Sequence, residues 1–113
     1  MSADSVRTPG SVAAVFAALA DPRRREVVDV IARTGQASAT AIAADLTVTR
    51  QAVAKHLVVL AEAGLVTSHR SGREVMYELR PAPLDAAARW LTSAAAVWDR
   101  RLAALKVAAE RKS

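Results

Sequence analysis

The sequence predicts a mainly α-helical domain with one small β-hairpin. Apolar residues recur every three or four positions in several separate stretches, which is the period of an α-helix. Residues 66–79 alternate instead as strands do, around a Ser-Gly turn signal. The chain has 113 residues, the size of one domain. We therefore expect a single domain over 11–113, preceded by a loose polar arm over 1–10.

Composition narrows the classes of protein. Apolar residues make up 52% of the chain, and many are alanine, so we expect a thin core with room for a second subunit to complete it. The absence of cysteine excludes disulfides and thiolate metal sites. No apolar run has the roughly 20 residues of a membrane span, and no signal peptide is evident, so we expect a soluble, cytoplasmic protein. The net charge of +5 favours a polyanionic partner such as nucleic acid, although many basic proteins bind none.

Two helices are predicted before residue 36. Ser11 can cap the first. Its apolar positions are Val12, Val15, Phe16 and Leu19. The second begins at Asp21-Pro22, an N-cap followed by proline at the first helical position, and ends at Thr34-Gly35. Its apolar face consists of Val27, Val28 and Ile31.

Arg23, Arg24 and Arg25 occupy the first turn of this second helix. The helix macrodipole disfavours positive charge at that end, so these side chains need partners. Two interpretations stay open. One is a salt bridge to an acidic residue elsewhere in the fold, and the other is a contact with DNA phosphates.

Residues 39–66 predict two helices joined by a short turn. Ser38 or Thr40 can cap the first helix. Its inward residues are Ile42, Ala43 and Leu46. Thr47-Val48-Thr49 forms the turn, in which Val48 fills the angle between the helices and Thr49 caps the second.

The second of these helices has two contrasting sides. The buried stripe is predicted to be Val53, Leu57, Leu60 and Ala61. The opposite side carries Arg50, Gln51, Ala54, Lys55 and Val58. Gly64 is a suitable C-cap, and Leu65 supplies the apolar contact that usually follows one. This is the layout of a helix-turn-helix, whose second helix enters the major groove of DNA.

A hairpin directly follows this second helix, as the wing follows the recognition helix in a winged helix. Val75, Tyr77 and Leu79 alternate on one face, which must pack on the helices because a lone hairpin is marginally stable. Arg70 and Arg73 flank the tip. A solvated tip is one interpretation, but their place beside the helix favours phosphate or minor-groove contact.

A last helix is predicted from about Leu84 to about residue 110, after Pro81 and Pro83. An apolar seam repeats four and three apart at Leu84, Ala88, Leu91, Ala95, Trp98, Leu102 and Leu105. A second apolar edge consists of Trp90, Ala94 and Val97. Such a helix spans about 40 Å, whereas a domain of this size has a radius of gyration of about 13 Å. We expect the seam to form a symmetric homodimer, and a helix that wraps its own domain is the alternative.

Taken together, positions 12–105 resemble the ArsR (arsenic-repressor-like) family of winged-helix transcriptional regulators. The resemblance is carried by FAALADPRRREVVDVI, TRQAVAKHLVVLAEAGLV and RSGREVMYEL. It implies a homodimer, built on the first and last helices, that reads an imperfect promoter palindrome and usually represses transcription. The implied DNA-contacting residues are Thr49, Arg50, Gln51, Ala54, Lys55, His56, Arg70 and Arg73. The expected dimer residues are Val12, Val15, Phe16, Leu84, Leu91, Trp98, Leu102 and Leu105.

The chain departs from the family pattern in two respects. Ala54 stands where the family usually has serine, which removes a polar contact and puts local base specificity in doubt. Metal-sensing relatives use a cysteine pair in the helix that here reads AIAADL, or Asp/His pairs on the last helix, which here has no histidine. The two histidines, His56 and His69, are too few for zinc, which needs three or four donors. We therefore expect no metal and no cofactor, with His69 at the surface and His56 binding phosphate or a partner subunit.

An enzyme is not expected. The chain has no cysteine nucleophile, no metal-spaced acidic or histidine cluster and no phosphate-cradling glycine motif. Two alternatives to a specific repressor stay open: a protein–protein module that uses the apolar seam, and an architectural DNA binder without sequence preference. The operator, the target genes, the sign of regulation and any small-molecule inducer are not written in the sequence.

Overall fold

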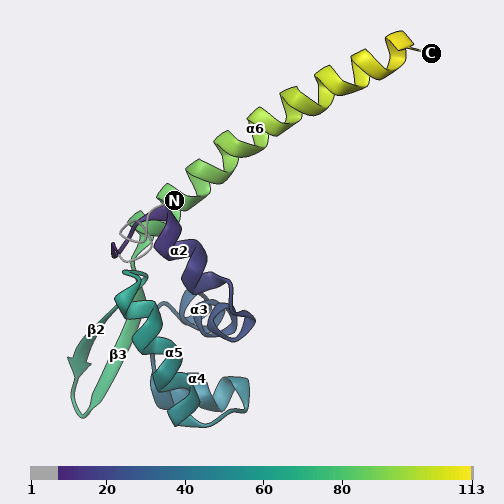
Figure 1. The fold of residues 1–113 in the computed structure, drawn as a ribbon. Helices are drawn as coiled ribbons and strands as arrows, with labels where there is room; N and C mark the ends of the chain where they lie inside the picture. Colours follow the sequence, from purple (N-terminus) through teal and green to yellow (C-terminus); the bar gives the residue numbers. More distant parts are fainter. Residues whose placement is uncertain (1–7, 113) are drawn as a thin grey trace.

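The computed structural model describes residues 8–112, which form helices around a small antiparallel sheet. In chain order the elements are α2 (Val12–Leu19), α3 (Pro22–Thr34), β1 (Ala37–Ser38), α4 (Ala39–Leu46), α5 (Arg50–Glu62), β2 (Val66–Ser71), β3 (Glu74–Leu79) and α6 (Pro81–Lys112). Figure 1 shows the hairpin tip, α4 and α5 at one end of the molecule, while α6 projects from the other. The predicted mainly helical fold with a β-hairpin is confirmed. Most of the arm expected over 1–10 lies outside the described residues.

Short-range hydrogen bonds begin four of the helices. In each case the cap oxygen accepts the backbone N–H two or three residues further on, at 2.8 to 3.1 Å. The four caps are Ser11, Asp21, Ser38 and Thr49. Of the two residues that were candidates for α4, Ser38 is therefore the cap and Thr40 is not.

Gly64 terminates helix α5. This residue has φ +82°, its N–H donates to the carbonyl of Ala61 at 3.0 Å, and the N–H of Leu65 donates to the carbonyl of Leu60 at 2.9 Å. These are the two bonds of a Schellman motif, in which Leu65 is fully buried. The predicted C-cap is confirmed.

The first turn of α3 binds the end of α2. Arg24 donates through Nε to the carbonyl of Ala18 at 2.6 Å, and Arg25 donates to the carbonyl of Leu19 at 2.6 Å. These carbonyls lie at a helix C-terminus, where they lack intrahelical donors and carry partial negative charge. Arg24 also pairs with Asp21 at 3.3 Å. The predicted salt bridge to an acid elsewhere in the fold is thus wrong, because carbonyls of α2 are the main partners and the acid is the helix's own cap.

The sheet has three strands in the order β1-β3-β2, all antiparallel. In β1, Ala37 pairs with Tyr77 and Ser38 with Met76. The expectation of a two-stranded hairpin missed this strand, which has two small residues and no β-forming side chain. Since α4 starts directly after β1, the pairing fixes the start of α4 beside the hairpin.

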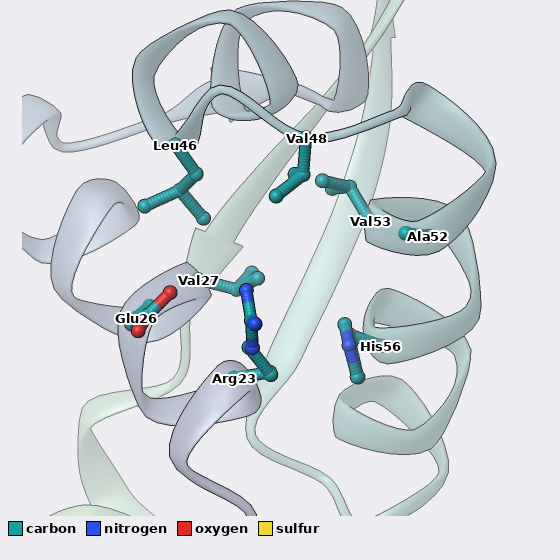
Figure 2. Close-up of a pocket in the computed structure, with 8 residues that line it drawn as sticks. All are labelled: Arg23, Glu26, Val27, Leu46, Val48, Ala52, Val53 and His56. Atoms are coloured by element: carbon teal, nitrogen blue, oxygen red, sulfur yellow. The ribbon is translucent and has the colours of Figure 1, made fainter.

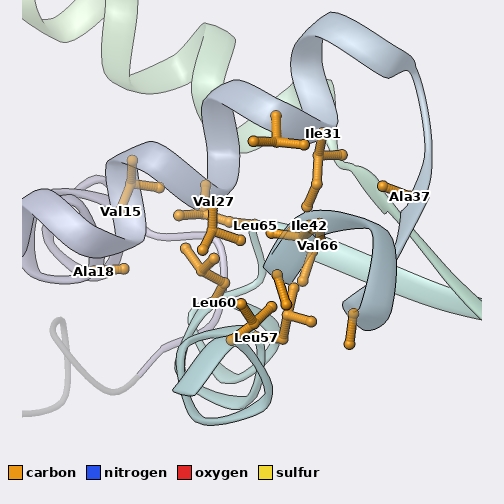
Figure 3. Packing of buried hydrophobic residues seen from close by; sticks show 14 of the residues in the cluster. Val15, Ala18, Val27, Ile31, Ala37, Ile42, Leu57, Leu60, Leu65 and Val66 are labelled. Carbon is orange, nitrogen blue, oxygen red and sulfur yellow. The ribbon is translucent and has the colours of Figure 1, made fainter. Parts of the chain in front are cut away.

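The core lies between α2, α3, α4, α5 and the base of the hairpin. Figure 3 shows buried apolar side chains from these elements packed against one another. The largest fully buried side chains are Ile31, Ile42, Leu57, Leu60, Leu65, Val15, Val27 and Val53. Two predicted faces need correction. On α3, Val30 is buried and Val28 is only partly buried, so Val30 belongs to the apolar face. On α5, Ala61 was predicted to be buried but is exposed at the edge of the buried stripe. Tyr77 and Leu79 pack on the core, whereas Val75 near the tip is 39% exposed because the hairpin extends beyond the helices.

Helix α6 is the longest element. It starts at Pro81, three residues before the predicted Leu84, since proline is tolerated in a first turn. Its 32 residues span about 48 Å and raise the radius of gyration to 18.6 Å. Only its first turns pack on the core, through Ala87 and partly through Leu84. In the part of the chain that the structure describes, no helix combines the length and apolarity needed to cross a membrane.

Candidate nucleic-acid interface

One side of α5 is fully open to solvent. The residues exposed there are Arg50, Gln51, Ala54, Lys55 and Val58, which we call the recognition face. At about 100° per residue they fall within an arc of about 140°, whose centre lies about 120° around the helix from the buried stripe. Thr49, at the start of the helix, caps it and is also exposed. The predicted contrast between the two sides of this helix is confirmed.

The wing brings two further arginines beside the start of α5. Arg70 lies opposite Val75 in the hairpin register, and Ser71 pairs with Glu74, so Arg73 belongs to the tight turn at the tip. Arg50, Arg70 and Arg73 border the same open hollow of about 340 Å³. In the structure as described, none of these guanidinium groups has a hydrogen bond or ion pair within the chain. Three cationic groups from two segments therefore converge on one surface and remain available to an anionic partner.

The start of α4 contributes polar groups that the sequence analysis missed. Ser38 and Thr40 line the hollow together with Tyr77 of β3. Ser38 is occupied as a helix cap, whereas Thr40 is exposed. The placement follows from the pairing of β1 with β3, and sequence spacing carries no signal for it.

His56 lies away from the recognition face. It is half-buried and faces α3, where it lines a pocket with Arg23 (Figure 2). The resemblance placed it among the DNA contacts, but the helical period puts it almost opposite Val58. We therefore leave His56 out of the proposed DNA-contacting set. His69, in contrast, is an exposed wing residue as predicted, with Nδ1 3.4 Å from Oε1 of Glu78.

The residues expected at a dimer interface differ in exposure. On α6 the exposed fractions are 52% for Leu91, 58% for Trp98, 58% for Leu102 and 65% for Leu105. Val12 and Phe16 of α2 and Leu84 of α6 are partly buried. Val15 is fully buried in the core of its own domain, so its side chain does not reach a partner.

Helices α2 and α6 form one continuous surface. The ring of Phe16 meets that of Trp90 edge to face, with centroids 5.6 Å apart and an interplanar angle of 66°. Further along α6, the guanidinium of Arg101 lies 5.3 Å from the ring centroid of Trp98. Apart from Arg101, the side chains named on this surface are apolar, and beyond the first turns of α6 they are exposed.

No group of three or more metal-ligating side chains comes together among residues 8–112. Among the acidic residues of 8–112, Asp21 has a clearly altered pKa. The backbone N–H of Arg23 lowers the pKa of Asp21, and electrostatic interactions with Arg24 and His56 lower it further. The ionised carboxylate of Asp21 therefore acts as the N-cap of α3.

The fold and its basic, exposed helix define a helix-turn-helix domain with a wing. Residues 19–69 match the family described as "Helix-turn-helix domain". The transcriptional repressor SdpR of Bacillus subtilis is 30% identical over 77 residues, which cover 68% of this chain and 84% of that protein.

Solved structures that resemble this chain are also winged helix-turn-helix or ArsR-like regulators. An ArsR-like transcriptional regulator from Rhodococcus sp. RHA1 is 47% identical, with a TM-score of 0.71 and coverage of 84% of this chain and 89% of that one. A homodimeric winged helix-turn-helix DNA-binding domain from Mycobacterium bovis is 30% identical, with a TM-score of 0.59 and coverage of 80% and 81%. The chain belongs to the ArsR family of winged helix-turn-helix transcriptional regulators.

Proposed function

We propose that this regulator is a homodimeric, sequence-specific repressor that binds a palindromic promoter site. One observation carries the proposal: Arg50 of α5 and Arg70 and Arg73 of the wing border one exposed hollow with no partner among the described residues. Three free guanidinium groups beside an exposed helix suit a DNA duplex, with Arg70 and Arg73 placed for the phosphate backbone and Arg50 for a base edge in the major groove.

The recognition face supplies the residues that would read bases. Arg50 pairs best with guanine and Gln51 with adenine, because their side chains match the hydrogen-bonding edges of those bases. Lys55, Arg70 and Arg73 bind phosphates and fix the orientation of the helix. Ala54 offers only a methyl group, so base selection rests on the first turn of α5.

The apolar surface of α6 supports a dimer. Leu91, Trp98, Leu102 and Leu105 are each more than half exposed in one chain, and burying such side chains contributes about 1.5–3 kcal/mol each. The related M. bovis domain is a homodimer. Two-fold symmetry would place two α5 helices in successive major grooves about 34 Å apart, and a dimer bound across a promoter would block RNA polymerase.

DNA binding is tested by identifying a site through genome-wide footprinting and measuring its affinity against random duplex. We expect Arg50→Ala to weaken specific binding more than non-specific binding, and Arg73→Ala to weaken both and flatten the salt dependence. Arg111→Ala, at the exposed far end of α6, removes the same charge away from the interface and is the control. Intact affinity of Arg50→Ala for the palindrome would refute the assignment of the recognition face. A specific-to-random ratio near one would leave an architectural DNA binder.

The dimer is tested by size-exclusion chromatography with light scattering. Leu102→Asp places a charge on the apolar seam and should yield monomers with weaker DNA binding. Ala103→Asp is the matched control, because it adds the same charge one residue away on an exposed position outside the seam. A wild-type monomer would refute the homodimer and favour a heterologous partner for α6.

A further inference from the structure

We propose that a pocket behind the recognition helix binds a small aromatic carboxylate and that occupation of this pocket lowers DNA affinity. The pocket lies between α3, α4 and α5 and has a volume of about 200 Å³. Its apolar wall is formed by Val27, Leu46, Val48, Ala52 and Val53. Arg23, Glu26 and His56 are its polar residues.

The size of the pocket suits one ring. An apolar cavity of about 150 Å³ accommodates benzene, so about 200 Å³ accommodates a benzene ring with one or two small substituents. Valine, leucine and alanine side chains make the wall, which favours an apolar body over a sugar or a free phosphate.

The polar groups select an anion. Figure 2 shows the side chain of Arg23 pointing into the pocket between Glu26 and His56. Arg24 and Arg25 are occupied by the end of α2, but the Arg23 guanidinium has no hydrogen bond or ion pair with any described residue. Its planar fork matches a carboxylate, and His56 can donate a further hydrogen bond from α5.

Glu26 refines the ligand class. Its carboxylate accepts hydrogen bonds and repels a second negative charge, so a ring hydroxyl on the ligand suits it better than a second carboxylate. A cation is disfavoured because Arg23 points into the same pocket. A ring with a single carboxylate and a hydroxyl, such as 4-hydroxybenzoate, therefore matches all three polar residues.

The pocket shares α5 with the DNA interface. Ala52, Val53 and His56 lie on the side of this helix opposite the recognition face. A ligand held between α3 and α5 would tilt α5 relative to the wing and separate Arg50 from Arg70 and Arg73. This coupling rests on the proposed DNA-binding function, whereas binding of the ligand does not. Typical coupling between two sites is about 5-fold to 150-fold, and we expect at least about 5-fold weaker operator binding.

Ligand binding is tested on the full chain without DNA. Benzoate, 4-hydroxybenzoate and neutral benzyl alcohol are titrated up to about 10 mM, and amide chemical shifts are followed by NMR. We expect saturable shifts confined to α3, α4 and the start of α5, tighter binding of 4-hydroxybenzoate than of benzoate, and the weakest binding by benzyl alcohol. Absence of saturable shifts with both carboxylates, or equal binding of benzyl alcohol, would overturn the site.

Two variants keep the test specific. Arg23→Gln should weaken carboxylate binding about tenfold or more, because it removes the charged donor that would bind the carboxylate. The fold should be unaffected, because the Arg23 guanidinium makes no hydrogen bond or ion pair with a described residue. Ala52→Leu fills the pocket but keeps every polar group, and should block binding. Arg111→Ala, at the exposed far end of α6 and away from the pocket, should bind ligand normally. Unchanged binding in Ala52→Leu, with folding verified by circular dichroism, would overturn the site.

DNA affinity is measured separately with and without saturating 4-hydroxybenzoate. Weaker operator binding in the wild type, but not in Ala52→Leu, supports the coupling. Ligand binding with unchanged operator affinity overturns the coupling. If the free protein bound no DNA, the proposed function would fail, and the NMR titration would still decide the pocket.

Discussion

Replacing Gly64 with alanine tests how the chain before α2 packs on the end of the recognition helix. Gly64 has φ +82°, and a Cβ there would lie 2.6 Å from the nitrogen and 3.1 Å from the Cα of Gly10. Those atoms are backbone and cannot rotate away. The same segment is fixed by a hydrogen bond, since the N–H of Gly10 donates to the carbonyl of Ala63 at 2.8 Å.

The magnitude follows from comparison with Gly35, which closes α3. Gly35 has φ +84°, and a Cβ there would meet nothing within 4 Å. Gly35→Ala therefore costs only the strained backbone conformation, with φ +84° and ψ −47°, about 1–3 kcal/mol. Gly64→Ala has a backbone cost of the same kind. In addition, the new Cβ displaces the backbone of Gly10 and breaks its hydrogen bond to Ala63, and the loss of that bond alone costs about 0.5–1.5 kcal/mol. We expect a loss of about 2–4 kcal/mol for Gly64→Ala.

Urea denaturation followed by far-ultraviolet circular dichroism measures both variants. Protein concentration is kept constant, because the stability of a dimer depends on it. Gly64→Ala should unfold at lower urea than Gly35→Ala. Equal midpoints would refute the reasoning, since they would mean that the segment around Gly10 moves aside at no cost. The recognition face lies at the other end of α5, so operator affinity of the folded fraction should change little.

Three further predictions concern the starts of the helices. Arg24→Ala should lower the free energy of unfolding, measured in urea, by about 1.5–3 kcal/mol, because the hydrogen bond from Arg24 to the carbonyl of Ala18 is charge-assisted. Arg23→Ala is the control and should leave the free energy of unfolding unchanged. Equal losses in the two variants would contradict the assigned contacts. Thr49→Ala should cost about 1 kcal/mol in thermal unfolding through loss of the α5 cap, and Thr49→Ser should retain most of it. The pKa of Asp21 is lowered below its ordinary value of 3.8, mainly by the N–H of Arg23, so its contribution is complete above that value and is lost as pH falls through the lowered pKa. Asp21→Asn should flatten this acid limb of a stability-versus-pH profile, and an unchanged limb would contradict the role of the carboxylate.

Sequence by itself determined the helices and the two sides of α5. Each cap acts within two or three residues of itself, so Ser11, Asp21 and Thr49 could be identified from spacing alone. The Gly64-Leu65 helix end and the exposed basic face of α5 are equally local. The helical period also held the information that His56 lies opposite the recognition face, although the family resemblance placed it with the DNA contacts.

Tertiary structure decided which distant groups meet. The pairing of β1 with β3 depends on strand register, and two small residues give no propensity signal for it. The partners of Arg24 and Arg25 are backbone carbonyls of another helix, which no residue type reveals. The convergence of Arg50 with Arg70 and Arg73, and the pocket between Arg23 and His56, depend on the angles at which packed elements cross. Those angles are set by the fit of buried side chains from several segments, and spacing along one segment does not contain them.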